Sequence, residues 1–292
     1  MSNFYILSCS GKPIYSRQNS ITDAETTAFF QTILSFFLDD QDSLISFTAG
    51  SFTWAFLIKG PLYYVAVSDA CSDSMLRLQL DWLHSQMMSI LTHYQISRLF
   101  QDRISVDLRP LLGSTAQLDL YIDSFSGHLD SLLDALSFIK CPPKLRKDLS
   151  QVLKQALTNS ATHLKSCLFF GMLIAKNRLI TFIRHKKHAL VPSDLHLLLN
   201  LVYASDSTIQ MAESWSPICL PKFNPNGFLY CYFSFLGPDL CLVLLSPDKD
   251  AFFQLSEYKS RIVDSLSVLP SVPQLLLCIQ SFPFSLSKLL FY

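Results

Sequence analysis

Glycine and charge are both scarce in this chain of 292 residues. It contains 8 glycines, and Asp, Glu, Lys and Arg together make up 16% of the residues. A P-loop nucleotide hydrolase needs the pattern GxxxxGK[ST], which the sequence lacks. The pair Gly11-Lys12 is followed by Pro13, which has no backbone N–H to offer to a phosphate. We therefore interpret Gly11-Lys12 as a structural turn.

An excess of positive charge is also missing. The chain has 23 basic and 23 acidic side chains, whereas nucleic-acid-binding proteins usually carry a basic excess. The sequence thus predicts no nucleic-acid partner. Its densest basic stretch is RHKKH, residues 184–188, in which Arg184, Lys186 and Lys187 are candidates for contact with an anionic membrane surface. The alternative for this stretch is a solvated loop.

Catalytic and metal-binding motifs are absent as well. The eight cysteines form no CxxC pair and lie mostly in apolar stretches, which is typical of reduced thiols in the cytosol. The sequence has no GxSxG elbow, and its histidines do not converge with further metal ligands. The N-terminus lacks the basic and apolar regions of a signal peptide. These absences predict a cytosolic protein that binds other proteins and has no catalytic residue, metal site or cofactor.

The end of the chain is short of charge. The run from Ser265 to Ser287 has no charged residue, but Pro270, Pro273 and Pro283 interrupt it. A membrane-spanning helix needs ~20 mostly apolar residues, and three prolines would break it repeatedly. We expect no membrane span here. A protein anchored by this tail is the weaker alternative.

The sequence does contain short apolar runs separated by turn signals. In the first hundred residues two strand-like runs precede a helix, and three more precede a second helix. The runs cover residues 4–7, 13–16, 44–49, 53–58 and 63–67, and the helices begin near Thr22 and Asp73. An antiparallel sheet with helices packed against it fits this order. The second helix is expected to bury one stripe, namely Leu76, Leu80, Leu83, Met87, Ile90, Leu91 and Tyr94.

The same order of elements returns in the second half. Strand-like runs cover residues 168–174, 179–184, 218–220, 228–236 and 240–246, and helices begin at Pro192 and near Asp250. Gly60-Pro61 and Gly237-Pro238 mark matching hairpins, and the offset between them carries Asp73 onto Asp250. These matches predict a duplicated module. The mostly helical residues 106–165 would connect the two copies.

The first helix has an unusually wide apolar surface. At 100° per residue, one arc holds Phe29, Phe30, Ile33, Leu34 and Phe37. Phe36 and Leu38 widen it to about half of the cylinder, whereas a helix on one sheet needs a stripe of only ~100°. The excess favours a second protein partner, and the alternative is coverage by the chain's own linker. The partner-binding candidates are Phe29, Ile33, Phe36, Phe37 and Leu38.

Several long segments resemble a known family. They are FYILSCSGKPIYSR (residues 4–17), GPLYYVAVS (60–68), DLRPLLG (107–113), PSDLHLLLNLV (192–202), SWSPICLPKFNPNGF (214–228) and DLCLVLLSPDKDAFFQLSEYKSRI (239–262). In this order they resemble the conserved part of the Mon-one vacuolar fusion proteins over about residues 1–265. That family is built from longin modules, each a five-stranded sheet between helices.

The resemblance implies an α+β fold, an α-β-α sandwich of two successive longin domains. Each would have a five-stranded, mainly antiparallel sheet flanked by helices, with a helical linker between them. The expected limits are 1–105 for the first domain, 106–165 for the linker and 166–266 for the second domain. Residues 267–292 form an atypical apolar tail where the family continues into a third longin domain, as in a truncated chain.

The resemblance also implies a function. The chain would pair with a Ccz-one-type longin protein as an exchange factor for a late-endosomal Rab-seven-type GTPase, in endosome maturation and vacuole or lysosome fusion. A Rab-five-type GTPase and an anionic phosphoinositide membrane would recruit it from the cytoplasm to late endosomes, vacuoles or lysosomes as a peripheral protein. Lys12, Tyr15 and Tyr63 are GTPase-facing candidates, with core packing as the alternative for the two tyrosines. The alternative function is a longin scaffold or adaptor without exchange activity.

Overall fold

The computed structural model describes residues 2–17, 24–103, 105–113, 115–125, 136–158, 168–184, 187–204, 213–237 and 239–280. Thr22, Lys186 and residues 281–292 therefore lie outside the described residues. The chain divides into two compact units, Met1–Asp123 and Ser124–Tyr292. Each unit is described by itself.

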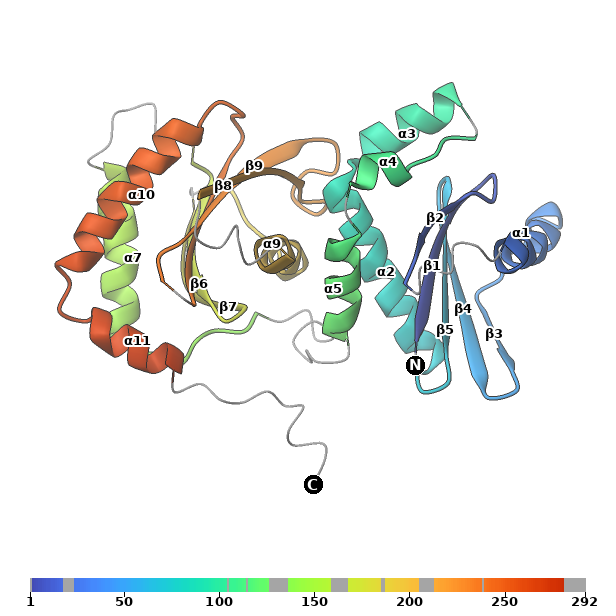
Figure 1. The fold of residues 1–292 in the computed structure, drawn as a ribbon, viewed down its shortest axis with the longest axis horizontal. Coiled ribbons are helices and arrows are strands. Elements are labelled where there is room, and N and C mark those ends of the chain that lie inside the picture. Colours follow the sequence, from blue (N-terminus) through green and yellow to red (C-terminus); the bar gives the residue numbers. More distant parts are fainter. Residues whose placement is uncertain are drawn as a thin grey trace. The chain divides into compact units, whose positions relative to one another are not determined.

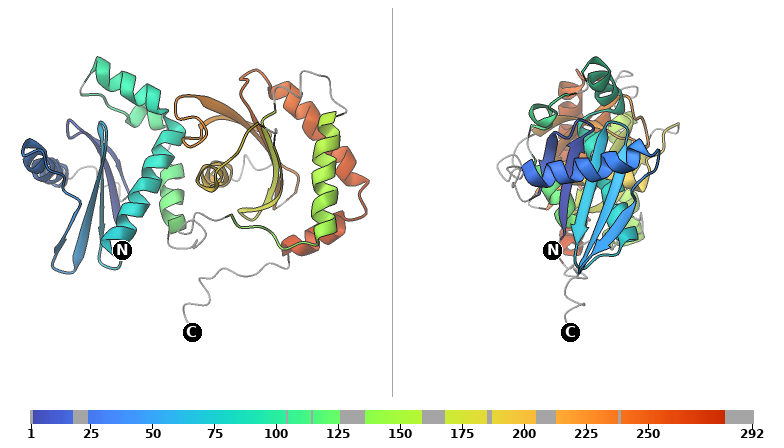
Figure 2. Two further views of the ribbon diagram at one scale, coloured as in Figure 1. Left: turned by 180° about the vertical axis from the view of Figure 1, so that it is seen from behind. Right: turned by 90° about the vertical axis from the view of Figure 1, so that its right-hand side faces the viewer.

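The first unit is built on a five-stranded antiparallel sheet with the strand order β2-β1-β5-β4-β3. The strands are β1 (Asn3–Ser8), β2 (Pro13–Ser16), β3 (Ser46–Ala49), β4 (Phe52–Lys59) and β5 (Leu62–Ser68). Helix α1 (Ala24–Asp39) lies across one face, and helix α2 (Asp73–Ile90) covers the other (Figures 1 and 2). This confirms the predicted sandwich.

Helix α1 stops at a well-formed C-terminal cap. Gln41 adopts a left-handed conformation with φ 58°. Its N–H donates to the carbonyl of Leu38, and the N–H of Asp42 donates to the carbonyl of Phe37. This is the Schellman arrangement, which satisfies carbonyls that the helix leaves open. The cap holds the last apolar turn of α1 in place above the sheet.

The helix predicted to run from Asp73 to Tyr94 is in fact two helices. Leu91 is extended, and the Thr92 hydroxyl caps a new helix, α3 (His93–Asp102), by accepting from the N–H of Gln95. The stripe from Leu76 to Leu91 is largely buried as predicted, but Tyr94 is exposed. The prediction that Tyr94 would be buried was wrong because the threonine cap redirects the chain before this residue.

A half-buried histidine holds α2 to the sheet. The Tyr64 hydroxyl and His84 Nδ1 are 2.9 Å apart, and the two rings meet edge to face. Burial, and then the charge of Lys59, lower the pKa of His84 to about 4. The folded protein therefore keeps this imidazole neutral at pH values where an unfolded chain, with a pKa of about 6.5, would protonate it.

We expect the free energy of unfolding to fall as the pH drops from about 6.5 towards 4. The unfolded state binds the His84 proton first, so this contribution is complete above the unfolded pKa and is lost by the folded pKa. Between pH 7 and pH 5 the loss is at most about 2 kcal/mol. Urea unfolding of wild type and His84→Gln at both pH values measures it. An identical loss in both proteins would contradict this origin.

The remaining helices of the first unit follow α3. They are α4 (Arg109–Leu112) and α5 (Ala116–Phe125). The Tyr15 hydroxyl donates to Asp119, and Arg17 forms an ion pair with Asp123, so β2 is tied to successive turns of α5. Residues 106–123, which the sequence assigned to a linker, thus pack within the first compact unit.

The second unit repeats the sheet, with the order β7-β6-β10-β9-β8. Its strands are β6 (Phe170–Ala175), β7 (Arg178–Arg184), β8 (Glu213–Cys219), β9 (Phe228–Phe235) and β10 (Leu240–Ser246). Helix α9 (Pro192–Ala204) lies on one face, and α7 (Pro143–Thr158) and α10 (Phe252–Ser267) lie on the other (Figure 1). The identical strand order bears out the predicted duplication.

The end of the second unit is partly packed. Helix α11 (Val272–Gln280) places Leu275 and Ile279 in the core beside α10, while Leu277 stays exposed. Within the described residues no single helix is long and apolar enough to cross a membrane. Only α10 and α11 taken together reach that length and apolarity, and they bend by 96° at their junction.

Candidate protein-binding surface

The inner face of α1 forms a small aromatic core with the first sheet. Phe30 and Leu34 are buried against Leu7, Phe56 and Val65. The Phe30 ring lies 5.1 Å from the Tyr5 ring and 5.9 Å from the Trp54 ring. This core anchors α1 on the sheet and thereby decides which of its side chains face outwards.

The outer face of α1 leaves large apolar side chains in solvent. Phe36 is 69% exposed, Phe29 is 47% exposed and Leu38 is 38% exposed. Ile33 and Phe37 are half-buried at the margin of the core. Phe29, which the sequence placed in the inner arc with Phe30, instead lies at its solvent edge, where its ring contacts the rings of Phe30 and Trp54 at about 6 Å.

Exposed apolar side chains continue from α1 onto the hairpin of β3 and β4. Ile45 is 46% exposed and Phe52 is 45% exposed. Phe47 stacks on Trp54 at 5.7 Å. The Trp54 indole N–H is buried and has no hydrogen-bond partner among the described residues. We define the apolar surface as Phe29, Phe36, Leu38, Ile45 and Phe52.

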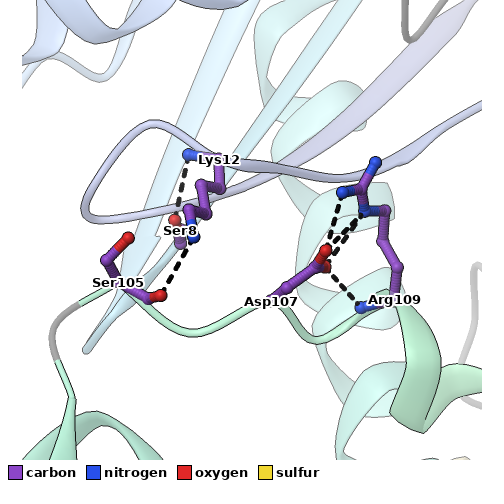
Figure 3. A network of polar contacts seen from close by, with 5 residues as sticks. All are labelled: Ser8, Lys12, Ser105, Asp107 and Arg109. Carbon is purple, nitrogen blue, oxygen red and sulfur yellow. Dashed lines mark hydrogen bonds and ion pairs between the residues drawn. The ribbon is translucent and has the colours of Figure 1, made fainter.

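The turn between β1 and β2 joins three parts of the first unit. Gly11, with φ +75°, lies so close to α1 that a Cβ there would be 1.6 Å from Gln31 Oε1. The N–H of Cys9 donates to the carbonyl of Pro61, in the turn between β4 and β5. On the far side of the turn, Lys12 Nζ donates to the carbonyl of Ser105 at 3.0 Å (Figure 3). The positive φ favours glycine at residue 11, where a side chain would also displace the end of the Gln31 side chain.

A charged pair follows Ser105 in the same cluster. Arg109 donates through Nε and an Nη to both carboxylate oxygens of Asp107 (Figure 3). This hydrogen bonding, with the charge of Lys12 as a smaller cause, holds the pKa of Asp107 below its usual value. Lys12 is exposed, so the cluster presents cationic groups on a rigid turn. Two of the segments singled out in the sequence, FYILSCSGKPIYSR and DLRPLLG, meet here.

The two candidate tyrosines differ in exposure. Tyr15 is 1% exposed and donates its hydroxyl to Asp119. Burial, then the hydrogen bond to Asp119, raise its pKa. Its side chain therefore faces the interior, as the core-packing alternative expected, and it is not available at the surface. Tyr63 is half-buried and packs against the core beneath α1.

The basic candidates of the second unit lie where β7 ends. Arg184 and Lys187 are exposed, and an Arg184 Nη donates to the carbonyl of His188 at 3.1 Å. The His188 ring stacks on Phe169 at 4.2 Å and lies 5.6 Å from the Phe223 ring. The loop after β7 therefore returns to the sheet through an aromatic cluster.

Phe223 belongs to a second loop that is fixed by a buried carboxylate. Asp194, in the first turn of α9, accepts hydrogen bonds from the N–H groups of Lys222 and Phe223 at 3.2 and 2.9 Å. Lys222 is exposed on this loop. The clamp gives the segment Lys222–Asn224 a structural role and brings a further cation near the loop that carries Lys187.

Comparison with known proteins assigns both units. Residues 2–122 match the first longin domain of FUZ, MON1 and HPS1, and residues 166–264 match the second longin domain of the same proteins. The chain belongs to this longin family. Each five-stranded sheet, together with the helices on its two faces, therefore forms a longin domain.

Curated relatives carry one name. The chain is 34% identical over 290 residues to "Vacuolar fusion protein MON1" of Cryptococcus neoformans, which covers 98% of this chain and 46% of that protein. It is 38% identical over 274 residues to the protein of the same name from Yarrowia lipolytica, covering 90% of this chain and 48% of that protein. The chain thus spans about half the length of these MON1 relatives.

Part of the longin surface was missed by sequence reasoning. Ile45 was interpreted as an ordinary strand residue and Phe52 was left between two strand-like runs, although both are nearly half exposed. One signal could have found them, since residues 43–58 carry no charged side chain at all. A strand pair with one solvated face normally alternates apolar with polar residues. The lack of this alternation indicates a hairpin with more apolar side chains than its own core can bury.

Proposed function

We propose that this chain is a subunit of a guanine-nucleotide exchange factor for a late-endosomal Rab-seven-type GTPase, and that it pairs with a Ccz-one-type longin protein. The apolar surface of the first longin domain carries the proposal, because an exposed row of phenylalanines on a folded, capped helix indicates a protein interface. The name of the MON1 relatives supports a role in fusion at the vacuole.

The exchange mechanism would involve no covalent step. The complex binds the nucleotide-free GTPase more tightly than the loaded one, and this differential affinity shifts the GTPase towards nucleotide release. The chain would contribute positioned surfaces instead of a reacting group. The partner would cover Phe29, Ile33, Phe36, Phe37 and Leu38 of α1. Lys12 and Tyr63 remain the proposed GTPase-facing residues, whereas Tyr15 acts from inside by fixing β2 to α5.

Recruitment would use the second longin domain. Arg184, Lys186 and Lys187 would contact phosphoinositide headgroups, with each exposed cation adding about 1 kcal/mol near an anionic leaflet. A Rab-five-type GTPase would assist, and the protein would be cytoplasmic and peripheral on late endosomes, vacuoles or lysosomes. The proposed domain limits stay at 1–105, 106–165 and 166–266, with 267–292 as the tail, and the first part of the linker, residues 106–123, packs with the first domain.

Nucleotide release tests the proposal directly. The chain and its longin partner, co-expressed and purified as a complex, should speed release of a fluorescent GDP from a Rab-seven-type GTPase at least about tenfold, which corresponds to a barrier lowered by ~1.4 kcal/mol. The same complex should leave a GTPase of another class unaffected. A folded complex that forms but does not accelerate release would favour the scaffold or adaptor function instead.

A further inference from the structure

The second longin domain has an open pocket of about 630 Å³ between helix α7 and strand β7. Arg146, Lys147 and Ser150 line it from α7, and Ile180 and Thr181 line it from β7. None of the basic candidates in the loop after β7 takes part in it. The pocket is therefore separate from the surfaces to which a role has been given above.

Helix α7 begins with positive charge where a helix normally favours negative charge. It starts at Pro143, and its first turn contains no acidic residue. Lys144, Arg146 and Lys147 follow the proline instead. The open N–H groups of a helix N-terminus already give this end a positive partial charge, so the cations add to an unfavourable local field. Among the described residues no carboxylate lines the pocket, and a bound anion would relieve this repulsion.

Arg146 is held in one orientation by its neighbours. One Nη donates to the carbonyl of Ile139 at 2.8 Å and lies 3.5 Å from Cys141 Sγ. The guanidinium carbon lies 5.2 Å from the centre of the Phe138 ring. The other nitrogens of the guanidinium can still donate to a ligand. Since Phe138 is 42% exposed, a fixed positive charge and an exposed apolar ring lie side by side.

The pocket also contains two hydroxyls that are free to bind a ligand. Thr181 is 4% exposed, and its hydroxyl makes no hydrogen bond to any residue that the structure describes. The hydroxyl of Ser150 is equally free within that part of the chain. Ile183, two residues after Thr181, packs into the core under α7, so Thr181 faces α7 as well. Because buried hydroxyls are normally hydrogen-bonded, Thr181 marks a position for a ligand oxygen.

The walls of the pocket differ in polarity, and this difference selects the kind of anion. The cations and the serine hydroxyl lie along α7, whereas Phe138, Ile180 and Phe182 supply apolar surface. An inositol phosphate headgroup carries hydroxyls or phosphates around its whole ring, so it would leave this apolar surface against polar atoms. A peptide in which an acidic residue adjoins an apolar one matches both walls.

We propose that this pocket binds a short acidic peptide segment of another protein. A carboxylate of the peptide accepts charge-assisted hydrogen bonds from Arg146 and Lys147, with the Thr181 hydroxyl as a further donor. An aliphatic or aromatic side chain next to that carboxylate packs on Phe138. The inference goes beyond the proposed function, since the site is in the second longin domain and involves neither the GTPase nor a lipid.

Selection from a library of random heptapeptides displayed on phage tests the inference on the full chain. Wild type should enrich peptides in which Asp or Glu adjoins an apolar residue. Fluorescence polarisation then measures the affinity of the most enriched peptide at about 0.15 M salt. Lys147→Gln should weaken binding at least about fivefold, and Thr181→Val, which keeps the shape but removes the hydroxyl, at least about threefold.

The matched control is Lys154→Gln. It removes an exposed lysine two turns further along the same flank of α7, outside the pocket, and should bind the peptide within about twofold of wild type. Circular dichroism checks that each variant folds. Equal losses in Lys147→Gln and Lys154→Gln would indicate a general effect of charge and would overturn the inference.

Two other results would also overturn it. One is a selection that enriches no acidic peptide, or a selected peptide that binds Lys147→Gln and Thr181→Val as tightly as wild type. The other concerns lipid. If phosphatidylcholine vesicles that contain a phosphoinositide bind wild type at least about threefold more tightly than Thr181→Val, and no peptide is enriched, a lipid headgroup is the occupant.

Discussion

Replacing Phe36 by aspartate should reduce partner binding at least about 100-fold while the first longin domain stays folded. The ring is 69% exposed, and among the described residues its aromatic contact is with Phe37, its neighbour on the same helix. Its loss therefore costs the folded chain little. In a complex the new carboxylate would be buried against apolar atoms without a partner, and central aromatic anchors contribute about 2–4 kcal/mol each.

The matched control is Tyr94→Asp, which adds the same charge at an exposed aromatic on α3 of the same unit. It should bind the partner as wild type does. Circular dichroism checks that both variants fold, and titration calorimetry measures their affinities. Equal binding by Phe36→Asp and wild type would show that the partner does not use α1. Equal losses in both variants would indicate a general effect of charge.

Phe30→Ala should lower the free energy of unfolding of the first longin domain by about 3–5 kcal/mol, the usual range for a buried phenylalanine. Phe30 is 1% exposed and lies between Tyr5 and Trp54 in a core of few residues. Because this small core packs α1 against the sheet, few neighbouring side chains can move to fill the cavity. Denaturant unfolding followed by Trp54 fluorescence measures the loss.

Phe36→Ala provides the comparison for the core substitution. It removes the same ring from the same helix on the solvent side, so the free energy of unfolding should change by no more than about 0.5 kcal/mol. Similar losses in both variants would mean that α1 is not anchored through Phe30. Together the two alanine variants separate the face that stabilises the fold from the face available to a partner.

The duplicated fold could be predicted from the sequence because its signals are local. Turn residues such as Gly60-Pro61 mark the hairpins, and apolar periodicity marks the helices between them. The separation between the two Gly-Pro pairs also relates the start of the helix in the first half to its counterpart in the second half. The break before α3 was missed although it also has a local signal, since Thr92 is a good helix cap and Gln95 follows three residues later.

The surroundings of Tyr15 could not be predicted in this way. Its partner, Asp119, is 104 residues distant in sequence, and nothing near Tyr15 indicates that a helix will cover it. The exposure of Phe29 depends likewise on how far α1 rotates over the sheet. Trp54 and Phe30 decide that rotation, since both pack against Phe29 in the folded domain. Such contacts arise from tertiary packing. The local periodicity of a single sequence does not reveal which distant residues will meet.

The bonds from β2 to α5 bear on how the first longin domain can be isolated. A recombinant fragment that stops at residue 105 would delete Asp119 and Asp123, leaving the Tyr15 hydroxyl and the Arg17 guanidinium without their acceptors. The edge strand would then be free to fray, and the chain around Ile14 would become open to proteases. A fragment that extends through Phe125 retains both carboxylates and should resist digestion.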